Sequence, residues 1–330
     1  MTRVAVLGGG SWGTALAQAV SQGDHEVVLW ARDRSLVEAI NTSHENPRYL
    51  PGAPLDPGIR ATGDLAGAAR GELLLLVVPA QHLRALGQRL AEVLPGPRPL
   101  VICCKGIERG SGALMSEVLA EVLPGPPLAV LSGPTFAAEV VRGLPCAVTL
   151  ACGEESTGAV LLDALGSRHF RPYLSDDVIG VEVGGAVKNV IAIACGIVMG
   201  RGLGENARAA LITRGLAEVV RLSRAKGGRP QTAMGLSGLG DLTLTCCGPQ
   251  SRNYSLGVAL GEGRALADVL AERHTVAEGV FTAEAVLALA ARLDVEMPIC
   301  DAVHAVLHRG GDLGETIAGL LARPFRSEHP

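Results

Sequence analysis

The chain has 330 residues, of which 48% are apolar and only 3% aromatic, and its formal net charge is -4. A chain of this length buries a large core and has room for two domains, and here the core must be built from aliphatic side chains. The slightly acidic balance, with dispersed arginines, excludes a protein that binds nucleic acid through a basic patch.

The eight cysteines include two adjacent pairs but no Cys-x-x-Cys spacing. Adjacent cysteines rarely form a disulfide and the spacing does not suit zinc, so we expect reduced thiols and no bound metal. The N-terminal residues lead directly into a strand pattern without a secretion signal. We therefore expect a cytoplasmic protein.

Short aliphatic runs alternate with amphipathic segments through the first half of the chain. This alternation is typical of a parallel sheet with crossover helices. We expect strands at Arg3–Leu7, Glu26–Trp30, Leu73–Val78, Leu100–Cys104, Ala129–Leu131 and Cys146–Ala151, and helices such as Thr14–Ser21 and Leu83–Leu94. The first half is therefore predicted to be an α/β domain with a doubly wound, mostly parallel sheet.

A glycine-rich turn directly follows the first expected strand and opens a helix. Gly8, Gly10 and Gly13 match the Gly-x-Gly-x-x-Gly pattern of dinucleotide-binding proteins. Gly8 allows the tight turn, Gly10 lets the backbone approach a pyrophosphate, and Gly13 lets the helix pack on the strand. The helix N-terminus would then present N–H groups and a positive dipole to the phosphates.

The end of the second strand indicates which nucleotide is bound. An acidic residue there would hold a ribose 2′-hydroxyl, whereas an arginine accommodates a 2′-phosphate. Here Arg32 and Arg34 flank Asp33, which stands one step beyond the usual acidic position. The pattern favours NADPH as cofactor and leaves NAD open.

Ligands in such sheets bind at the carboxyl ends of the strands. Two further strand ends carry candidate site residues, at Lys105-Gly106 and in Ser132-Gly-Pro-Thr-Phe136. We expect Lys105 to face the cofactor or the substrate.

The pattern changes near residue 180. The run Gly180–Gly200 is long and apolar, but because it contains Glu182 and Lys188 we expect a buried helix and no membrane insertion. Ala207–Lys226, Ala277–Leu293 and Ile299–Arg309 have helical spacing, and no convincing strand follows. We therefore expect a dinucleotide-binding domain over residues 1–180 and an all-α substrate domain over residues 181–330.

Only three of the 29 basic residues are lysines, and one of them, Lys188, lies in that apolar run. A desolvated lysine has a lowered pKa and can exchange a proton, which arginine cannot do near neutral pH. Lys188 is therefore a candidate catalytic or substrate-binding residue.

Two loops in the second half are further candidates. The glycine-dense segment Gly235–Asp241 follows no strand, so we interpret it as a turn that delivers Asp241, although a plain loop between helices fits the spacing equally well. In Gln250-Ser-Arg-Asn253 the three last side chains have the chemistry to hold a phosphate, although a helix cap with a surface arginine is the default interpretation of this pattern.

These motifs together resemble the bacterial NAD(P)-dependent glycerol-3-phosphate dehydrogenases. The matching stretches follow the family's order over nearly the whole chain: Gly8–Gly13, Cys104–Glu108, Leu131–Ala137, Gly184–Val190, Asn206–Gly215, Gly238–Asp241 and Ser251–Asn253. The resemblance implies reversible reduction of dihydroxyacetone phosphate to sn-glycerol 3-phosphate, which supplies phospholipid synthesis. It also implies a Rossmann domain, a helical C-terminal domain and a cytoplasmic homodimer.

The resemblance also assigns roles to residues. It implies nucleotide contacts for Ser11, Trp12, Arg32, Tyr49, Ala137, Arg252, Val276 and Glu278, and substrate contacts for Gly133, Thr135, Ser251, Arg252 and Asn253. It implies that Lys188 is the proton donor and acceptor, Asp241 its charged neighbour, and Lys105 a residue at the junction of cofactor and substrate.

The expected reaction passes a hydride from the nicotinamide to the C2 carbonyl, and Lys188 protonates the oxygen. A β-hydroxyacid or ketopantoate-type dehydrogenase is an alternative with the same chemistry, but its carboxylate substrates need no phosphate site at Ser251–Asn253. A non-catalytic NADP sensor is a second alternative, which would have no need of Lys188 with Asp241.

Overall fold

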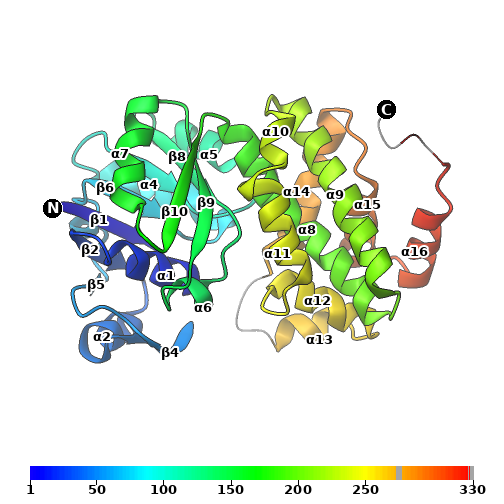
Figure 1. The fold of residues 1–330 in the computed structure, drawn as a ribbon, viewed down its shortest axis with the longest axis horizontal. Helices are drawn as coiled ribbons and strands as arrows, with labels where there is room; N and C mark the ends of the chain where they lie inside the picture. The colour runs from blue at the N-terminus through cyan, green and yellow to red at the C-terminus, as the bar shows by residue number, and fades with distance from the viewer. Residues whose placement is uncertain (273–276, 326, 328–330) are drawn as a thin grey trace.

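The computed structural model describes residues 1–272, 277–325 and 327. A half that contains the main sheet and a half made of helices lie side by side, with the N-terminus in the first and helix α16 (Leu313–Leu321) at the far end of the second (Figure 1). The last strand ends at Ser175, and the first helix of the second half begins at Val178.

Eight strands form one sheet in the order β10-β9-β8-β7-β6-β1-β2-β5, in which every neighbouring pair is parallel except β8 and β9. The bounds are β1 Thr2–Leu7, β2 His25–Trp30, β5 Arg60–Thr62, β6 Leu73–Leu76, β7 Leu100–Ile102, β8 Leu128–Ser132, β9 Cys146–Cys152 and β10 Phe170–Ser175. The chain reverses its direction across the sheet between β1 and β6, and ligands bind at such a switch point.

Alternating side chains on each strand build two cores, one on each face of the sheet. Val4 and Val6 face one core, whereas Ala5 and Leu7 face the other. Helices α1 (Ser11–Val20), α2 (Arg34–Ser43), α6 (Ala137–Val140) and α7 (Glu155–Leu165) cover the first face; α3 (Leu65–Ala68), α4 (Leu83–Val93) and α5 (Met115–Val122) cover the second. The predicted α/β class with a mostly parallel sheet is confirmed.

The strands that contain no apolar run were not predicted from the sequence. β10 is an edge strand with Pro172 in its middle and Tyr173 and Leu174 exposed, so it lacks the buried run of a central strand. The three-residue β5 and the small hairpin of β3 (Glu45–Asn46) and β4 (Leu50–Pro54) are too short to show a period.

Every element after β10 in the described residues is a helix. They are α8 Val178–Gly200, α9 Gly204–Lys226, α10 Pro230–Ala233, η2 Leu236–Gly240, α11 Asp241–Cys247, α12 Arg252–Gly261, α13 Leu266–Ala271, α14 Glu278–Arg292, α15 Pro298–His308 and α16 Leu313–Leu321. The expected all-helical second half is confirmed.

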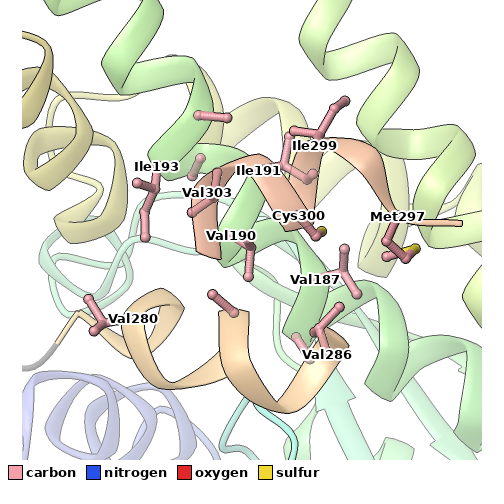
Figure 2. Packing of buried hydrophobic residues seen from close by; sticks show 14 of the residues in the cluster. Val187, Val190, Ile191, Ile193, Val280, Val286, Met297, Ile299, Cys300 and Val303 are labelled. Carbon is pink, nitrogen blue, oxygen red and sulfur yellow. The ribbon is translucent and has the colours of Figure 1, made fainter. Parts of the chain in front are cut away.

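Helix α8 is the centre of this half. Figure 2 shows Val187, Val190 and Ile191 of α8 packed among residues of α14 and α15, including Val286 and Cys300. By length and composition α8 could cross a membrane, but 89% of its apolar window is buried inside the fold. Its position is that of the core helix of a folded domain.

Candidate active site

The glycine turn after β1 has the shape that a bound pyrophosphate needs. A Cβ at Gly13 would lie 1.8 Å from the carbonyl oxygen of Gly8, and one at Gly8 would lie 2.4 Å from that of Val77. A Cβ at Gly10 would instead meet no atom within 4 Å. Since Gly10 precedes the first residue of α1, the open space lies at the helix N-terminus, where phosphate oxygens are favoured.

Basic residues lie at the end of β2. Asp33 caps α2 by accepting from Ser35 N at 3.0 Å, and it also pairs with Arg48 at 3.0 Å. Hydrogen bonds from Ser35 hold the pKa of the Asp33 carboxyl below its usual value. Arg32 and Arg34 are exposed, and neither forms an ion pair within the described part of the chain. Asp33 is therefore engaged locally, while the two arginines have side chains available for a ligand.

Asn46 connects this region to the glycine turn. Its buried side chain donates to the Gly9 carbonyl at 3.0 Å and to Thr14 Oγ1 at 2.7 Å, and it accepts from Tyr49 N at 3.1 Å. Tyr49 in turn lies under the guanidinium of Arg48, 5.3 Å from the ring centroid. Asn46 thus holds Tyr49 beside the turn, a role that the sequence did not indicate.

Two lysines from different halves share one carboxylate. Asp241 Oδ1 accepts from Lys188 Nζ, and Asp241 Oδ2 accepts from Lys105 Nζ at 2.6 Å. Lys188 also donates to Thr245 Oγ1 at 2.9 Å. The Asp241 side chain is only 1% exposed. Two lysines thus meet one carboxylate that is itself buried.

Burial lowers the pKa of the Lys188 ammonium from 10.5 to about 7. The Asp241 charge opposes this shift, and the positive charge of Lys105 adds to it. The direction is the one that the apolar sequence around Lys188 predicted. A group with a pKa near neutrality can both release and take up a proton under ordinary conditions.

Glycines let the supporting segments approach this cluster. A Cβ at Gly184 would lie 2.8 Å from the carbonyl oxygen of Ser237, and one at Gly185 would lie 2.9 Å from Ser132 Oγ. The turn of η2 therefore packs directly on α8 and delivers Asp241 at the start of α11, as the sequence predicted.

The loop after β8 contacts the lysine cluster through Gly133. Gly133 has a φ of +155°, and a Cβ there would lie 2.8 Å from the Val148 backbone. Its carbonyl oxygen accepts from Lys105 Nζ at 3.1 Å and from Thr135 Oγ1 at 3.3 Å. Ala137 follows at the start of α6.

The segment Ser251–Asn253 opens α12, and its Ser251 and Asn253 side chains form hydrogen bonds that hold the helix start in place. Ser251 is the N-cap and accepts from Tyr254 N at 3.2 Å. Asn253 donates to Asn189 Oδ1 and accepts from Gly279 N, both at 3.0 Å. Arg252 is exposed at the first turn of α12. Arg252 thus places a guanidinium at the N-terminus of α12.

Glu278 reaches from the helical half toward the sheet. It is the first residue of α14. Burial raises the pKa of its carboxyl, and the Arg252 charge and the backbone of Ala80 beyond β6 partly offset that rise. Glu278 Oε2 has no hydrogen-bond partner among the described residues, and the same holds for the indole nitrogen of Trp12. Val276 lies outside the described residues.

The structure thus brings Lys105, Lys188 and Asp241 together, with Gly133 and Thr135 beside Lys105. The sequence reading missed Thr245, although an Asp and a Thr four residues apart on one helix face could have indicated it.

Two family models match the chain. The one described as NAD-dependent glycerol-3-phosphate dehydrogenase N-terminus matches residues 3–158, and the one described as its C-terminus matches residues 177–318. The glycerol-3-phosphate dehydrogenase, NAD(P)+ type, of Rhodospirillum rubrum is 60% identical over 326 residues, covering 98% of this chain and 93% of the relative. The same enzyme of Caulobacter vibrioides is 55% identical, covering 99% and 98%.

Solved structures agree with these matches. The glycerol-3-phosphate dehydrogenase of Coxiella burnetii superposes with a TM-score of 0.94 at 40% identity, covering 98% of this chain and 99% of that one. A ketopantoate reductase of Ralstonia eutropha has a TM-score of 0.61 at 17% identity, covering 93% and 97%, so it shares the fold alone.

Proposed function

This chain belongs to the NAD-dependent glycerol-3-phosphate dehydrogenase family, and we propose that it reduces dihydroxyacetone phosphate reversibly to sn-glycerol 3-phosphate. It is an oxidoreductase with NAD or NADP as cofactor. The observation that carries the proposal is the carboxylate of Asp241 between Lys105 and Lys188 at the carboxyl edge of the sheet. A protein that only sensed NADP would have no need of this cluster.

When bound, NAD(P)H supplies the hydride for the C2 carbonyl of the substrate. Lys188 in its ammonium form donates a proton to the developing alkoxide, and in the reverse direction its neutral amine takes the hydroxyl proton. Asp241 and Thr245 fix the direction of the Lys188 Nζ atom. Lys105, held by Asp241 and the Gly133 carbonyl, adds positive charge beside the developing oxyanion.

The phosphate of the substrate is assigned to Arg252 and the N-terminus of α12. A guanidinium and helix N–H groups both favour a phosphate, and Ser251 and Asn253 hold that turn in place. Remote binding of the phosphate orients the carbonyl toward Lys188. We assign the substrate backbone to Gly133 and Thr135.

The nucleotide is assigned to the turn of Gly8, Gly10 and Gly13, with Ser11, Trp12, Tyr49 and Ala137 around it and Glu278 closing it from the helical half. The open space at Gly10 fits a pyrophosphate. Arg32 and Arg34 favour NADPH over NADH, because they offer charge to a 2′-phosphate.

We further propose a division into residues 1–180 and 181–330, a cytoplasmic homodimer, and a role in supplying phospholipid synthesis. These follow from family membership, and sedimentation of the purified protein tests the dimer against the 33.9 kDa monomer.

The test of the reaction is the oxidation of NADPH by the purified protein with dihydroxyacetone phosphate. We expect turnover with this substrate and little with dihydroxyacetone or ketopantoate, which lack the phosphate. Equal turnover of dihydroxyacetone, or turnover of ketopantoate alone, would overturn the substrate assignment. Binding of NADPH without any turnover would favour the sensor alternative.

A further inference from the structure

Glu182 is a buried carboxylate that the proposed reaction does not use. It lies on α8, six residues before Lys188, and is 6% exposed. Its Oε1 accepts from Ser116 N at 2.8 Å, and its Oε2 accepts from Ser116 Oγ at 2.5 Å. Because Ser116 belongs to α5, Glu182 joins the helix that carries Lys188 to the sheet-bearing half.

A cavity of about 10 Å³ lies beside Glu182. Its wall includes Lys105, Ser132 and Gly185. Ser132 is 3% exposed, and its Oγ has no hydrogen-bond partner among the described residues. A cavity of this size holds one water when polar groups line it. Glu182 and Ser132 supply such groups.

The wall shared with Lys105 connects this cavity to the catalytic cluster. Lys105 donates to Asp241 Oδ2 at 2.6 Å, and Asp241 Oδ1 accepts from Lys188. The cluster therefore holds two cations and one anion. Buried charges are costly unless they are balanced. An ionised Glu182 would bring the sum of these four side chains to zero.

We propose that Glu182 is a positioning residue for the reaction, acting as the second counter-charge of the lysine pair, with one ordered water in the cavity between Glu182, Ser132 and Lys105. The inference rests on the proposed role of Lys188 as proton donor. The other groups that face Glu182 are Glu117 of α5, Lys226 of α9 and the Cys104 thiol. Glu117 and Lys226 form an ion pair with each other at 2.6 Å, so their charges largely cancel.

The sign of the effect follows from electrostatics. A nearby anion favours the ammonium form of Lys188, so removing the Glu182 charge lowers the pKa of Lys188. Six residues of helix rise about 9 Å along the axis and leave the two side chains about 120° apart around it. The Glu182 charge therefore acts on Lys188 mainly through the cavity wall that Glu182 shares with Lys105, over a distance at which a partly screened charge still shifts a pKa. Burial raises the pKa of the Glu182 carboxyl to about 7, so this charge appears in the same pH range in which Lys188 titrates.

The experiment compares kcat against pH in both directions for the parent, Glu182→Gln and Glu218→Gln. The kcat for reduction depends on the Lys188 ammonium and falls as pH rises, whereas the kcat for oxidation depends on the neutral amine and rises. Each of these changes is one limb of a pH profile. Loss of the Glu182 charge should move both limbs to lower pH by roughly half to one unit. Glu218 is a matched control, because it is also a buried carboxylate and accepts hydrogen bonds from two backbone N–H groups at the start of α15.

If Glu182 had only a structural role, Glu182→Gln would lower kcat or raise KM without moving either limb of the pH profiles. The inference is overturned if Glu182→Gln leaves both limbs in place, or if Glu218→Gln moves them equally. Should Glu182→Gln not fold, Ser116→Ala replaces it. This variant loses the hydrogen bond from Ser116 Oγ but keeps the one from the backbone N–H, so Glu182 stays neutral to higher pH and both limbs of the pH profile should move to lower pH by less. A parent without any limb that depends on Lys188 would instead overturn the proposed function.

Discussion

At the scale of single residues, the behaviour of Lys188 depends on two opposed surroundings. The apolar helix α8 disfavours the ammonium, whereas the carboxylate of Asp241 favours it. Desolvation has the larger effect, so the pKa falls to about 7 and the proton can move in either direction. An arginine at this position would keep the positive charge but could not release a proton.

Lys188→Arg should therefore lower kcat by about 10²–10⁴-fold, the usual contribution of general acid–base catalysis. NADPH should still bind, because Lys188 contacts Asp241 and Thr245 and is not part of the glycine turn. Steady-state kinetics and NADPH titration measure the two properties. A variant that binds NADPH and keeps a tenth of the parent kcat would show that Lys188 supplies charge only, and Lys105 would then be the next candidate donor.

Arg252 tests the assignment of the substrate phosphate. A charge-assisted hydrogen bond contributes roughly 1.5–3 kcal/mol, so Arg252→Ala should lower kcat/KM for dihydroxyacetone phosphate by about one to two orders of magnitude. Dihydroxyacetone serves as the control substrate, and its slow turnover should change much less. Equal losses with both substrates would assign Arg252 to the cofactor or to the fold.

Arg32 tests the choice of nucleotide. Because its exposed guanidinium lies where a 2′-phosphate is expected, Arg32→Ala should raise the KM for NADPH far more than the KM for NADH. Initial rates with each cofactor at saturating substrate measure both constants. A parallel rise would remove Arg32 from the 2′-phosphate site.

At the scale of elements, the contact between α8 and α12 depends on paired glycines. Gly196 and Gly200 of α8 face Gly257 and Gly261 of α12, and a Cβ at any of them would lie within 2.4 Å of a backbone oxygen of the other helix. The two backbones therefore touch, which sets the position of Arg252 at the start of α12 relative to Lys188.

Gly257→Ala should lower the free energy of unfolding by about 1–3 kcal/mol, because the new Cβ would lie 2.1 Å from the Ile193 carbonyl oxygen. The matched control is Gly319→Ala on α16, where a Cβ meets no atom within 4 Å and helix propensity predicts a gain of up to about 1 kcal/mol. Chemical denaturation of both variants checks the difference. Similar effects of the two substitutions would mean that the helix contact tolerates separation.

At the scale of the whole molecule, the site is built where the two halves meet. Lys105, Gly133 and the glycine turn come from the sheet edge, whereas Lys188, Asp241 and Arg252 come from the helices. Glu278 contacts Ala80 and Glu182 contacts Ser116 across the same boundary. A ligand bound here contacts both halves, so binding and global stability are linked.

Two glycine substitutions separate cofactor binding from folding. Gly10→Ala fills open space at the N-cap, so it should cost below about 1 kcal/mol without ligand but weaken NADPH binding. Gly13→Ala would place a Cβ 1.8 Å from the Gly8 carbonyl oxygen and should lower the unliganded Tm directly. NADPH at 100 times its Kd stabilises the parent by about 2.7 kcal/mol.

Thermal unfolding with and without NADPH distinguishes the two glycine variants. NADPH should raise the Tm of the parent but not that of Gly10→Ala at the same concentration. Without NADPH, the Tm of Gly10→Ala should stay close to that of the parent. A full Tm rise in Gly10→Ala would show that the pyrophosphate does not approach this glycine.

The sequence by itself determined the features that rest on short-range patterns. Aliphatic runs alternating with amphipathic segments predicted the mostly parallel sheet, and the spacing of Gly8, Gly10 and Gly13 predicted the turn after β1. The apolar run around Lys188 predicted both a buried helix and a lowered pKa. Each of these follows from the residues next to one another along the chain.

Only the tertiary structure decided which side chains become partners. Lys105 and Asp241 are 136 residues apart, and no local pattern shows that one carboxylate serves both lysines. The sequence likewise left open whether Ser251 and Asn253 hold a ligand, whereas folding engages the first in a helix cap and the second in a link between α8 and α14. A local sequence pattern predicts the helix or strand to which a residue belongs and whether the residue is buried. A hydrogen bond between distant residues depends in addition on how their helices and strands pack against one another, and no local pattern contains that information.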